Sequence, residues 1–219
     1  SVCPGSTGHI YSVPAVTGAT GYLWVVPSGF SPVSGQTTNA ITLYATPEAQ
    51  SGNIKVKAVN TCSTNPFAPV LTVTVAPKPL PSLSGIDTVC AVTGGVVYST
   101  DPGMTNYAWT VTAGGTITAG SGTNSIQVTW LPAGTQSVSV IYTGTGGCTA
   151  PVPTVKNVTV NARPLPTITG PVTGCFDNQA TYSTEAGKSG YSWEIPSGAQ
   201  VISGGGNTPA VALKWTDSG

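Results

Sequence analysis

The chain has 219 residues, a formal net charge of zero and only seven Lys or Arg residues, so it lacks the clustered positive charge that nucleic-acid binding requires. No run of about 18 apolar residues occurs, so the sequence predicts no membrane-inserted segment. Its 28 Gly and 19 Pro residues interrupt stretches rich in Val, Ile, Thr and Tyr. This composition favours many short strands joined by turns, and we predict an all-β protein.

A set of landmarks recurs three times along the chain. Each copy has a cysteine, then a Tyr-Ser pair, a Tyr-x-Trp strand and a later strand of alternating apolar residues. The tryptophans at one position of the repeat, Trp24, Trp109 and Trp193, are almost evenly spaced. A period of this length allows each copy to bury its own core. We predict three immunoglobulin-like β-sandwich modules: copy one at residues 1–78, copy two at residues 79–162 and copy three at residues 163–219.

Copy two shows the expected strands most clearly. Apolar and polar residues alternate along short segments, which predicts strands in chain order at residues 96–99, 107–111, 116–118, 125–130, 137–142 and 155–160. This density of strands is typical of the immunoglobulin-like fold. Copy one begins without the stretch that matches residues 83–88, and copy three stops before its last two strands. We therefore expect a missing N-terminal strand in copy one, a truncated copy three with an open sheet edge, and a longer natural protein.

Two Pro-rich segments, at residues 77–81 and 163–166, separate the copies. Alternating prolines favour a semi-rigid polyproline-II spacer and remove backbone donors that would extend a strand. We expect modules joined end to end as a rod with limited bending.

The five cysteines recur at equivalent positions of the repeat. The separation between the first two cysteines almost equals that between the next two, which predicts the disulfides Cys3–Cys62 and Cys90–Cys148, with Cys175 left unpaired. Each bond would stabilise its module by roughly 4 kcal/mol, and two bonds indicate an oxidising compartment. Because the sequence has no Cys-x-x-Cys pair and one histidine, it predicts no metal site.

The sequence offers no residues that combine into a catalytic site. His9 lies in a Gly-rich stretch without a partnering acid, and we expect it to be an exposed loop residue. The seven carboxylates form no close pair of the kind that glycosidases use, and strand alternation turns Glu194 outward. The linkers also lack the acidic oxygens that calcium requires. We predict no catalytic residue, no metal and no cofactor.

The tryptophans fall into two groups. Trp24, Trp109 and Trp193 share one position on a central strand, which predicts core residues. Trp130 and Trp215 end a later alternating strand, and this place predicts packing in the core or at its rim. A flat indole face also suits sugar rings, so these two residues are candidates for ligand stacking.

The order of motifs resembles the PKD-like repeats of Bacteroidota surface proteins. In copy two it comprises Cys90, Tyr98-Ser99 and the segments 107–111, 114–117 and 120–130. The resemblance covers essentially the whole chain, although copy one is looser and the usual PKD signature Trp-Asp-Phe-Gly-Asp-Gly is absent. It implies an extracellular, cell-surface location in a large exported protein, similar in layout to gliding adhesins carried by type IX secretion.

The repeat, the stiff linkers and the predicted disulfides favour a non-catalytic stalk segment. Together with the resemblance, they predict a segment of a secreted adhesin for gliding motility or attachment, whose partners are further modules of the same chain and surface glycans or proteins. The motif Asp87-Thr88-Val89 resembles an O-glycosylation motif of the same bacteria and makes Thr88 a candidate site. The alternative is a carbohydrate- or protein-binding accessory module of a secreted multidomain enzyme.

Overall fold

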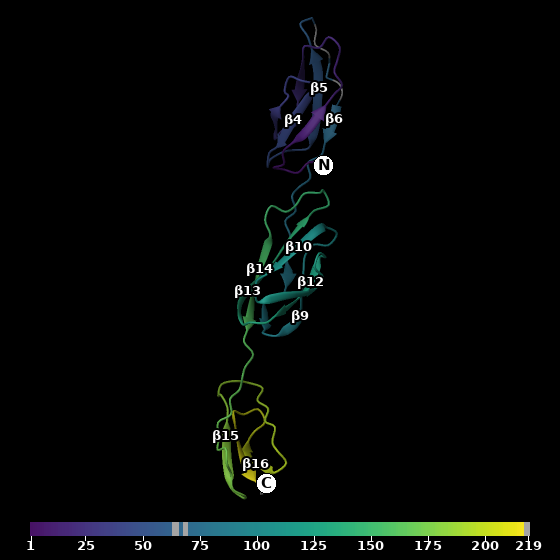
Figure 1. The fold of residues 1–219 in the computed structure, drawn as a ribbon. Helices are drawn as coiled ribbons and strands as arrows, with labels where there is room; N and C mark the ends of the chain where they lie inside the picture. Colours follow the sequence, from purple (N-terminus) through teal and green to yellow (C-terminus); the bar gives the residue numbers. More distant parts are fainter. Residues whose placement is uncertain (63–65, 68–69, 217–219) are drawn as a thin grey trace. The chain divides into compact units, whose positions relative to one another are not determined.

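The computed structural model describes residues 1–62, 66–67 and 70–216, and these contain β-strands but no helix. The chain divides into two compact units, Ser1–Ala162 and Arg163–Gly219. The first unit holds copies one and two, and the second holds copy three (Figure 1). The predicted all-β fold is confirmed.

Copy one is a sandwich of two antiparallel sheets. The first has the order β1–β4–β3 and consists of β1 (His9–Ser12), β4 (Ala40–Ala45) and β3 (Phe30–Ser34). The second has the order β2–β5–β6 and consists of β2 (Gly21–Val25), β5 (Gly52–Val59) and β6 (Val70–Val73). Alternation along β4 and β5 buries one face of each strand, and the core contains Phe30, Ile41, Leu43, Ile54 and Val73.

Copy two repeats this arrangement with additional strands. One sheet has the order β11–β12–β9–β7, formed by β11 (Gly115–Ala119), β12 (Ser125–Trp130), β9 (Thr93–Ser99) and β7 (Ser84–Gly85). The other has the order β10–β13–β14–β8, formed by β10 (Thr105–Val111), β13 (Gly134–Thr143), β14 (Thr154–Asn161) and β8 (Thr88–Cys90). Copy two has a core cluster of its own, so each of the first two copies is a separate sandwich.

Copy three has one sheet in its described residues. Its order is β15–β17–β16, formed by β15 (Gln179–Ser183), β17 (Ala210–Trp215) and β16 (Ala199–Gly204). The segment 191–195 matches β2 and β10 in sequence but is not a strand. In copies one and two that segment pairs with β5 or β13. The described residues of this unit contain no counterpart of either partner strand, so the segment has no ladder to join.

Trp130 is a core residue and not a ligand platform. Its side chain is fully buried, and its indole N–H donates to the Tyr98 hydroxyl at 3.2 Å. The two rings meet edge to face at 6.3 Å between centroids, and Tyr182 and Trp215 repeat this contact at 6.3 Å. Trp215 is half-buried with its indole nitrogen enclosed. The ligand-stacking hypothesis is therefore wrong for Trp130 and unsupported for Trp215, because strand alternation turns both indoles onto the inner face.

The other tryptophans lie at the margin of the core. Trp24 and Trp109 pack against the core clusters of copies one and two but, like Trp193, they are only half-buried. Each indole N–H donates to a backbone carbonyl in the turn before a strand of the facing sheet. The acceptors are Thr38 at 2.9 Å, Thr123 at 2.8 Å and Thr208 at 3.0 Å. In copies one and two this hydrogen bond joins the two layers of the sandwich, and in copy three it ties the Trp193 segment to the turn before β17.

The turn that receives this bond requires glycine in copies one and two. Gly35 and Gly120 have φ angles of 77° and 79°, a region that side chains rarely adopt. A Cβ atom at either position would lie 2.0 Å from a backbone oxygen across the turn. Both turns have the sequence Gly-x-x-Thr, from Gly35 to Thr38 and from Gly120 to Thr123, and this motif is the sequence signature of the turn that holds the tryptophan.

We predict that Trp130→Ala destabilises copy two by about 3–5 kcal/mol, because a large aromatic residue leaves the centre of a packed core. Leu131→Ala is the matched control, since the neighbouring Leu131 side chain is 55% exposed. Hydrogen exchange of the β9 amides in the 219-residue chain measures the change. A loss below about 1 kcal/mol for Trp130→Ala would contradict the core assignment.

Candidate functional site: a disulfide-linked junction

The two cysteines of copy one lie at opposite ends of the sandwich. Val2 bridges Val75 just after β6, and Gly52 at the start of β5 pairs with Val73, so Cys3 lies at the end where β5 begins. Cys62 follows the end of β5, which has eight residues. At about 3.3 Å per residue that strand spans roughly 26 Å, whereas a disulfide needs Cα atoms within about 7 Å. The predicted disulfide Cys3–Cys62 is wrong.

Copy two separates its cysteines in the same way. Cys90 pairs with Asn161 in the β8–β14 ladder, and the neighbouring Val160 pairs with Gly134 at the start of β13. Cys148 follows the far end of β13, which has ten residues and therefore spans roughly 33 Å. The predicted disulfide Cys90–Cys148 is also wrong.

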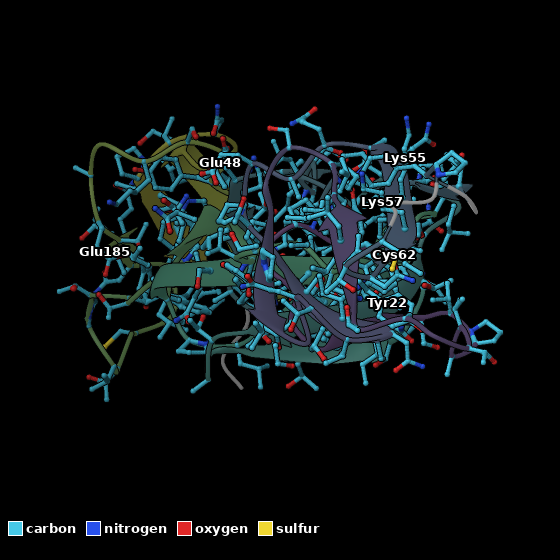
Figure 2. The ribbon with its side chains drawn as sticks, turned by 90° about the horizontal axis from the view of Figure 1, so that it is seen from above. Tyr22, Glu48, Lys55, Lys57, Cys62 and Glu185 are labelled. Carbon is cyan, nitrogen blue, oxygen red and sulfur yellow. A yellow bond between two sulfur atoms is a disulfide. The ribbon has the colours of Figure 1, made fainter. Side chains whose placement is uncertain are left out.

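The structure instead joins the two copies. Cys3 of copy one forms a disulfide with Cys148 of copy two, with a Cα–Cα distance of 5.5 Å and a sequence separation of 145. Cys62, Cys90 and Cys175 carry exposed free thiols, and Cys62 is labelled in Figure 2. Equal separations identified the equivalent positions of the cysteines, but they carried no information on which end of the sandwich each one occupies.

The disulfide is enclosed by close packing between copies one and two. Cys148 is 1% exposed, and its sulfur lies 3.5 Å from the carbonyl oxygen of Ala76, at the end of copy one. The Ser1 hydroxyl donates to the Gly146 carbonyl at 2.8 Å. Residues 144–148 form a turn closed by the Gly144 N–H, which donates to the Cys148 carbonyl. A Cβ atom on Gly146 would lie 2.4 Å from the Ala76 Cβ, so this turn reaches copy one only because residue 146 is glycine. The junction is therefore a fitted contact with a covalent bond inside it.

An acidic residue holds the first linker to copy two. Asp101 accepts hydrogen bonds from the Ser82 backbone N–H and hydroxyl, both at 2.8 Å, and from the Tyr142 hydroxyl at 2.7 Å. These bonds, that of Tyr142 foremost, lower the pKa of Asp101. Burial, reinforced by Asp101, raises the pKa of Tyr142 to about 12. Thr154 adds a hydrogen bond at 2.6 Å to the carbonyl of Pro81, so the linker is fixed where it enters the sandwich.

Glu185 performs the same task in copy three. It accepts from the Thr167 hydroxyl at 2.6 Å, the Thr167 backbone N–H at 3.1 Å and the Thr184 hydroxyl at 2.6 Å. These bonds, led by that of the Thr167 side chain, lower the pKa of Glu185 to about 2. The predictions for the acidic residues concerned catalysis and metal binding and did not include this role. The available signal was their shared position after Tyr-Ser-Thr, together with the Ser or Thr that follows each Pro-x-Pro linker.

His9 has a different setting from the one predicted. It lies in β1 rather than in a loop and is half-buried, with Nε2 at 2.7 Å from the Ser6 hydroxyl oxygen. The Ser6 hydroxyl also contacts the Cys3 carbonyl, and no carboxylate bonds to the histidine among the described residues. This pair lacks the orienting acid of a hydrolase triad.

The remaining candidates are exposed. Glu194 faces solvent, and Thr88 lies exposed in β8 with its hydroxyl 3.3 Å from an Asp87 carboxylate oxygen. The glycosylation of Thr88 stays a prediction. No cluster of three or more His, Cys, Asp or Glu side chains suited to a metal ion occurs among the described residues.

A hollow of about 940 Å³ opens in copy three beside Leu165, Tyr191 and Trp193. In copy two, the residue equivalent to Tyr191 is Tyr107, whose ring packs against Tyr142 of β13 at 5.6 Å between centroids. Trp109 likewise pairs with Val140 of β13. The hollow therefore lies where a strand of the sandwich lies in copy two, which makes it a poor candidate for a small-molecule site.

We predict that the Thr167 amide reports the protonation of Glu185 with a midpoint near pH 2. Because the folded-state pKa lies below the ordinary value of 4.5, the stabilisation is present above about pH 4.5 and is lost as the pH falls towards 2. An NMR pH titration of the Thr167 amide measures it, and Glu185→Gln is expected to abolish the step. A midpoint near 4.5 would show that Glu185 does not hold the linker.

Comparison with known proteins identifies a domain family over most of the chain. The sequence profile of the PKD-like domain matches residues 1–73, 76–158 and 161–218. No curated protein matches the chain. Among solved structures, titin domains I67–I69 (an E-to-A variant) share 9% identity with a TM-score of 0.41, over 99% of this chain and 84% of theirs. The D00–D0 domains of intimin share 13% identity with a TM-score of 0.36, over 72% of this chain and 94% of theirs.

Within the described residues, no helix has the length and apolar character to cross a membrane.

Proposed function

Because the chain belongs to the PKD-like domain family over almost its entire length, we propose that it is a non-catalytic stalk segment of a large secreted cell-surface adhesin. The proposed task is mechanical: repeated sandwiches carry a binding region at a distance from the cell, for attachment or gliding motility. The resemblance to Bacteroidota surface repeats supports this setting and a type IX secretion route.

The Cys3–Cys148 disulfide is the observation that carries this proposal. Tension applied along the chain enters copy one near Ser1, reaches Cys3 and passes through the bond to Cys148. Residues 4–147 lie outside this covalent path and cannot be extended while the bond is intact. Copy one and the strands of copy two up to β13 are thereby protected from forced unfolding, whereas β14 (Thr154–Asn161) stays in the force path.

The linkers support the same role. Asp101 and Glu185 each bind the residue that follows a Pro-x-Pro segment, so the chain enters copies two and three at a fixed point. The prolines restrict the backbone of the linker itself. The carboxylate fixes the residue that follows the linker. Together they limit bending at the base of each module.

An extracellular setting agrees with the chemistry of the junction. Disulfides persist in oxidising compartments and are rare in reducing ones. The partners we propose are other copies of the repeat in the same chain, with surface glycans or proteins bound elsewhere in the molecule. The accessory binding alternative has less support, because Trp130, half of its proposed stacking pair, is fully buried.

We predict that force spectroscopy on the oxidised 219-residue chain, held at its two ends, shows no extension from residues 4–147. Reduction of the disulfide, or Cys148→Ser, is expected to release the bypassed residues 4–147. Their extension should reach roughly 500 Å at about 3.6 Å per residue.

Cys62→Ser is the matched control, since it removes an exposed thiol and leaves the junction intact. Its force trace should equal that of the unmodified chain. If the oxidised chain releases the full length of copies one and two, the disulfide does not shield them and the mechanical role fails.

A further inference from the structure

Each of the three free thiols occupies the repeat position of Cys3 or of Cys148, the two cysteines that form the disulfide. Cys90 and Cys175 each occupy the position of Cys3, as the first cysteine of a copy, and Cys62 occupies the position of Cys148. Cys3 and Cys148 are bonded to each other across one junction. Each exposed thiol is therefore one half of a pair whose geometry is already visible elsewhere in this chain.

The backbone around Cys90 reproduces that around Cys3. Val2 bridges Val75 in parallel, and Val89 pairs with Val160 in parallel. In copy one the Ala76 N–H donates to the Val2 carbonyl, and in copy two the Ala91 N–H donates to the Asn161 carbonyl. Backbone hydrogen bonds thus hold each N-terminal segment beside the last strand of its copy. Cys90 thus lies beside the start of the second linker, as Cys3 lies beside the start of the first.

Cys62 lies at the end of copy one that corresponds to the docking end of copy two. Trp24 pairs with Val56 of β5, and Trp109 pairs with Val140 of β13, so β5 and β13 are equivalent strands. Cys62 and Cys148 each follow the end of that strand. Cys148 is buried by its contact with copy one, whereas Cys62 is exposed.

We propose that these cysteines form a staggered series of disulfides in a longer array. Cys90 bonds to the cysteine at the Cys148 position of the copy that follows it, and Cys62 bonds to the cysteine at the Cys3 position of a copy that precedes it. The partner in each case is a second PKD-like copy, presented end to end as copies one and two are.

The chemistry is an ordinary thiol oxidation. Two thiols lose two protons and two electrons and form one S–S bond. A disulfide oxidant, either a small molecule or a thiol–disulfide oxidoreductase, accepts them and leaves as two thiols. The end-to-end contact supplies a high local concentration of the two sulfurs, which favours this pairing over random ones.

A staggered series has a mechanical consequence. The Cys3–Cys148 loop covers copy one and copy two as far as residue 147, and a bond from Cys90 would form a second loop that begins inside the first. The two loops would overlap in residues 91–147, so tension between neighbouring junctions would divide among parallel covalent paths. These bonds would form whether the array serves as a stalk or as a binding module.

The test rebuilds the second junction from residues that this chain supplies. Residues 1–174 are followed directly by residues 3–162, so a second copy one, with its own Cys62, comes after the native linker of copy two. Residues 1–162 form a compact unit with a core in each copy, so both halves have what they need to fold. The protein is oxidised in a glutathione buffer, and its disulfides are mapped by mass spectrometry without reduction.

We expect three bonds: Cys3–Cys148 within each half, and Cys90 of the first half to Cys62 of the second. The remaining Cys62 and Cys90 should react with a thiol reagent. Cys62→Ser in the second half alone is the matched control and should restore one reactive thiol, at Cys90 of the first half. A free Cys90 beside two intact Cys3–Cys148 bonds overturns the proposal, as does a bond from Cys90 to any other cysteine.

Residues 1–162 alone provide a second measurement that does not depend on the fused chain. At high concentration in the same buffer, Cys90 of one molecule should join Cys62 of another, giving chains in which this pairing dominates. A statistical mixture with Cys62–Cys62 and Cys90–Cys90 bonds would overturn the proposal, because it would show no docking preference. If either experiment gives the contrary result, the Cys3–Cys148 force path is still intact. Failure of the staggered series is therefore distinguishable from failure of the stalk role.

Discussion

Two cysteines at opposite ends of one long β-strand cannot reach each other, and this constraint decides how the copies are joined. In copy one the strand is β5, and in copy two it is β13, the central partner of the Trp109 strand. A cysteine at the end of a sandwich can bond only to a group presented at that end. The structure places another copy there, so the covalent link runs between modules rather than within them.

The cysteines can link neighbouring modules because each of the first two sandwiches is complete in itself. Buried residues of β4 and β12 fill separate cores, and the half-buried tryptophans bond the two layers through the same Gly-x-x-Thr turn. With the core stabilised locally, the cysteines are not required for the fold of one module. They are available for the junction, where the linker is already short and held by Asp101.

Much of the fold could be predicted from the sequence, because strand alternation and the regular spacing of the repeat depend on local pattern. The core position of Trp130 is one such outcome, since β12 alternates without interruption up to its last residue. The disulfide could not be predicted in this way. Equal separations show that Cys3 and Cys90 are equivalent, but pairing depends on which end of a strand each occupies, and that is a property of the sheet. The roles of Asp101 and Glu185 could have been found, because both follow Tyr-Ser-Thr in the repeat.

The most direct test of this account is a disulfide map of the oxidised 219-residue chain. Free thiols are first alkylated under denaturing conditions, and trypsin and chymotrypsin then separate the cysteines without reduction. The account predicts one cross-linked pair of peptides, containing Cys3 and Cys148, with alkylated Cys62, Cys90 and Cys175. Cross-linked peptides that pair Cys3 with Cys62 and Cys90 with Cys148 would contradict it.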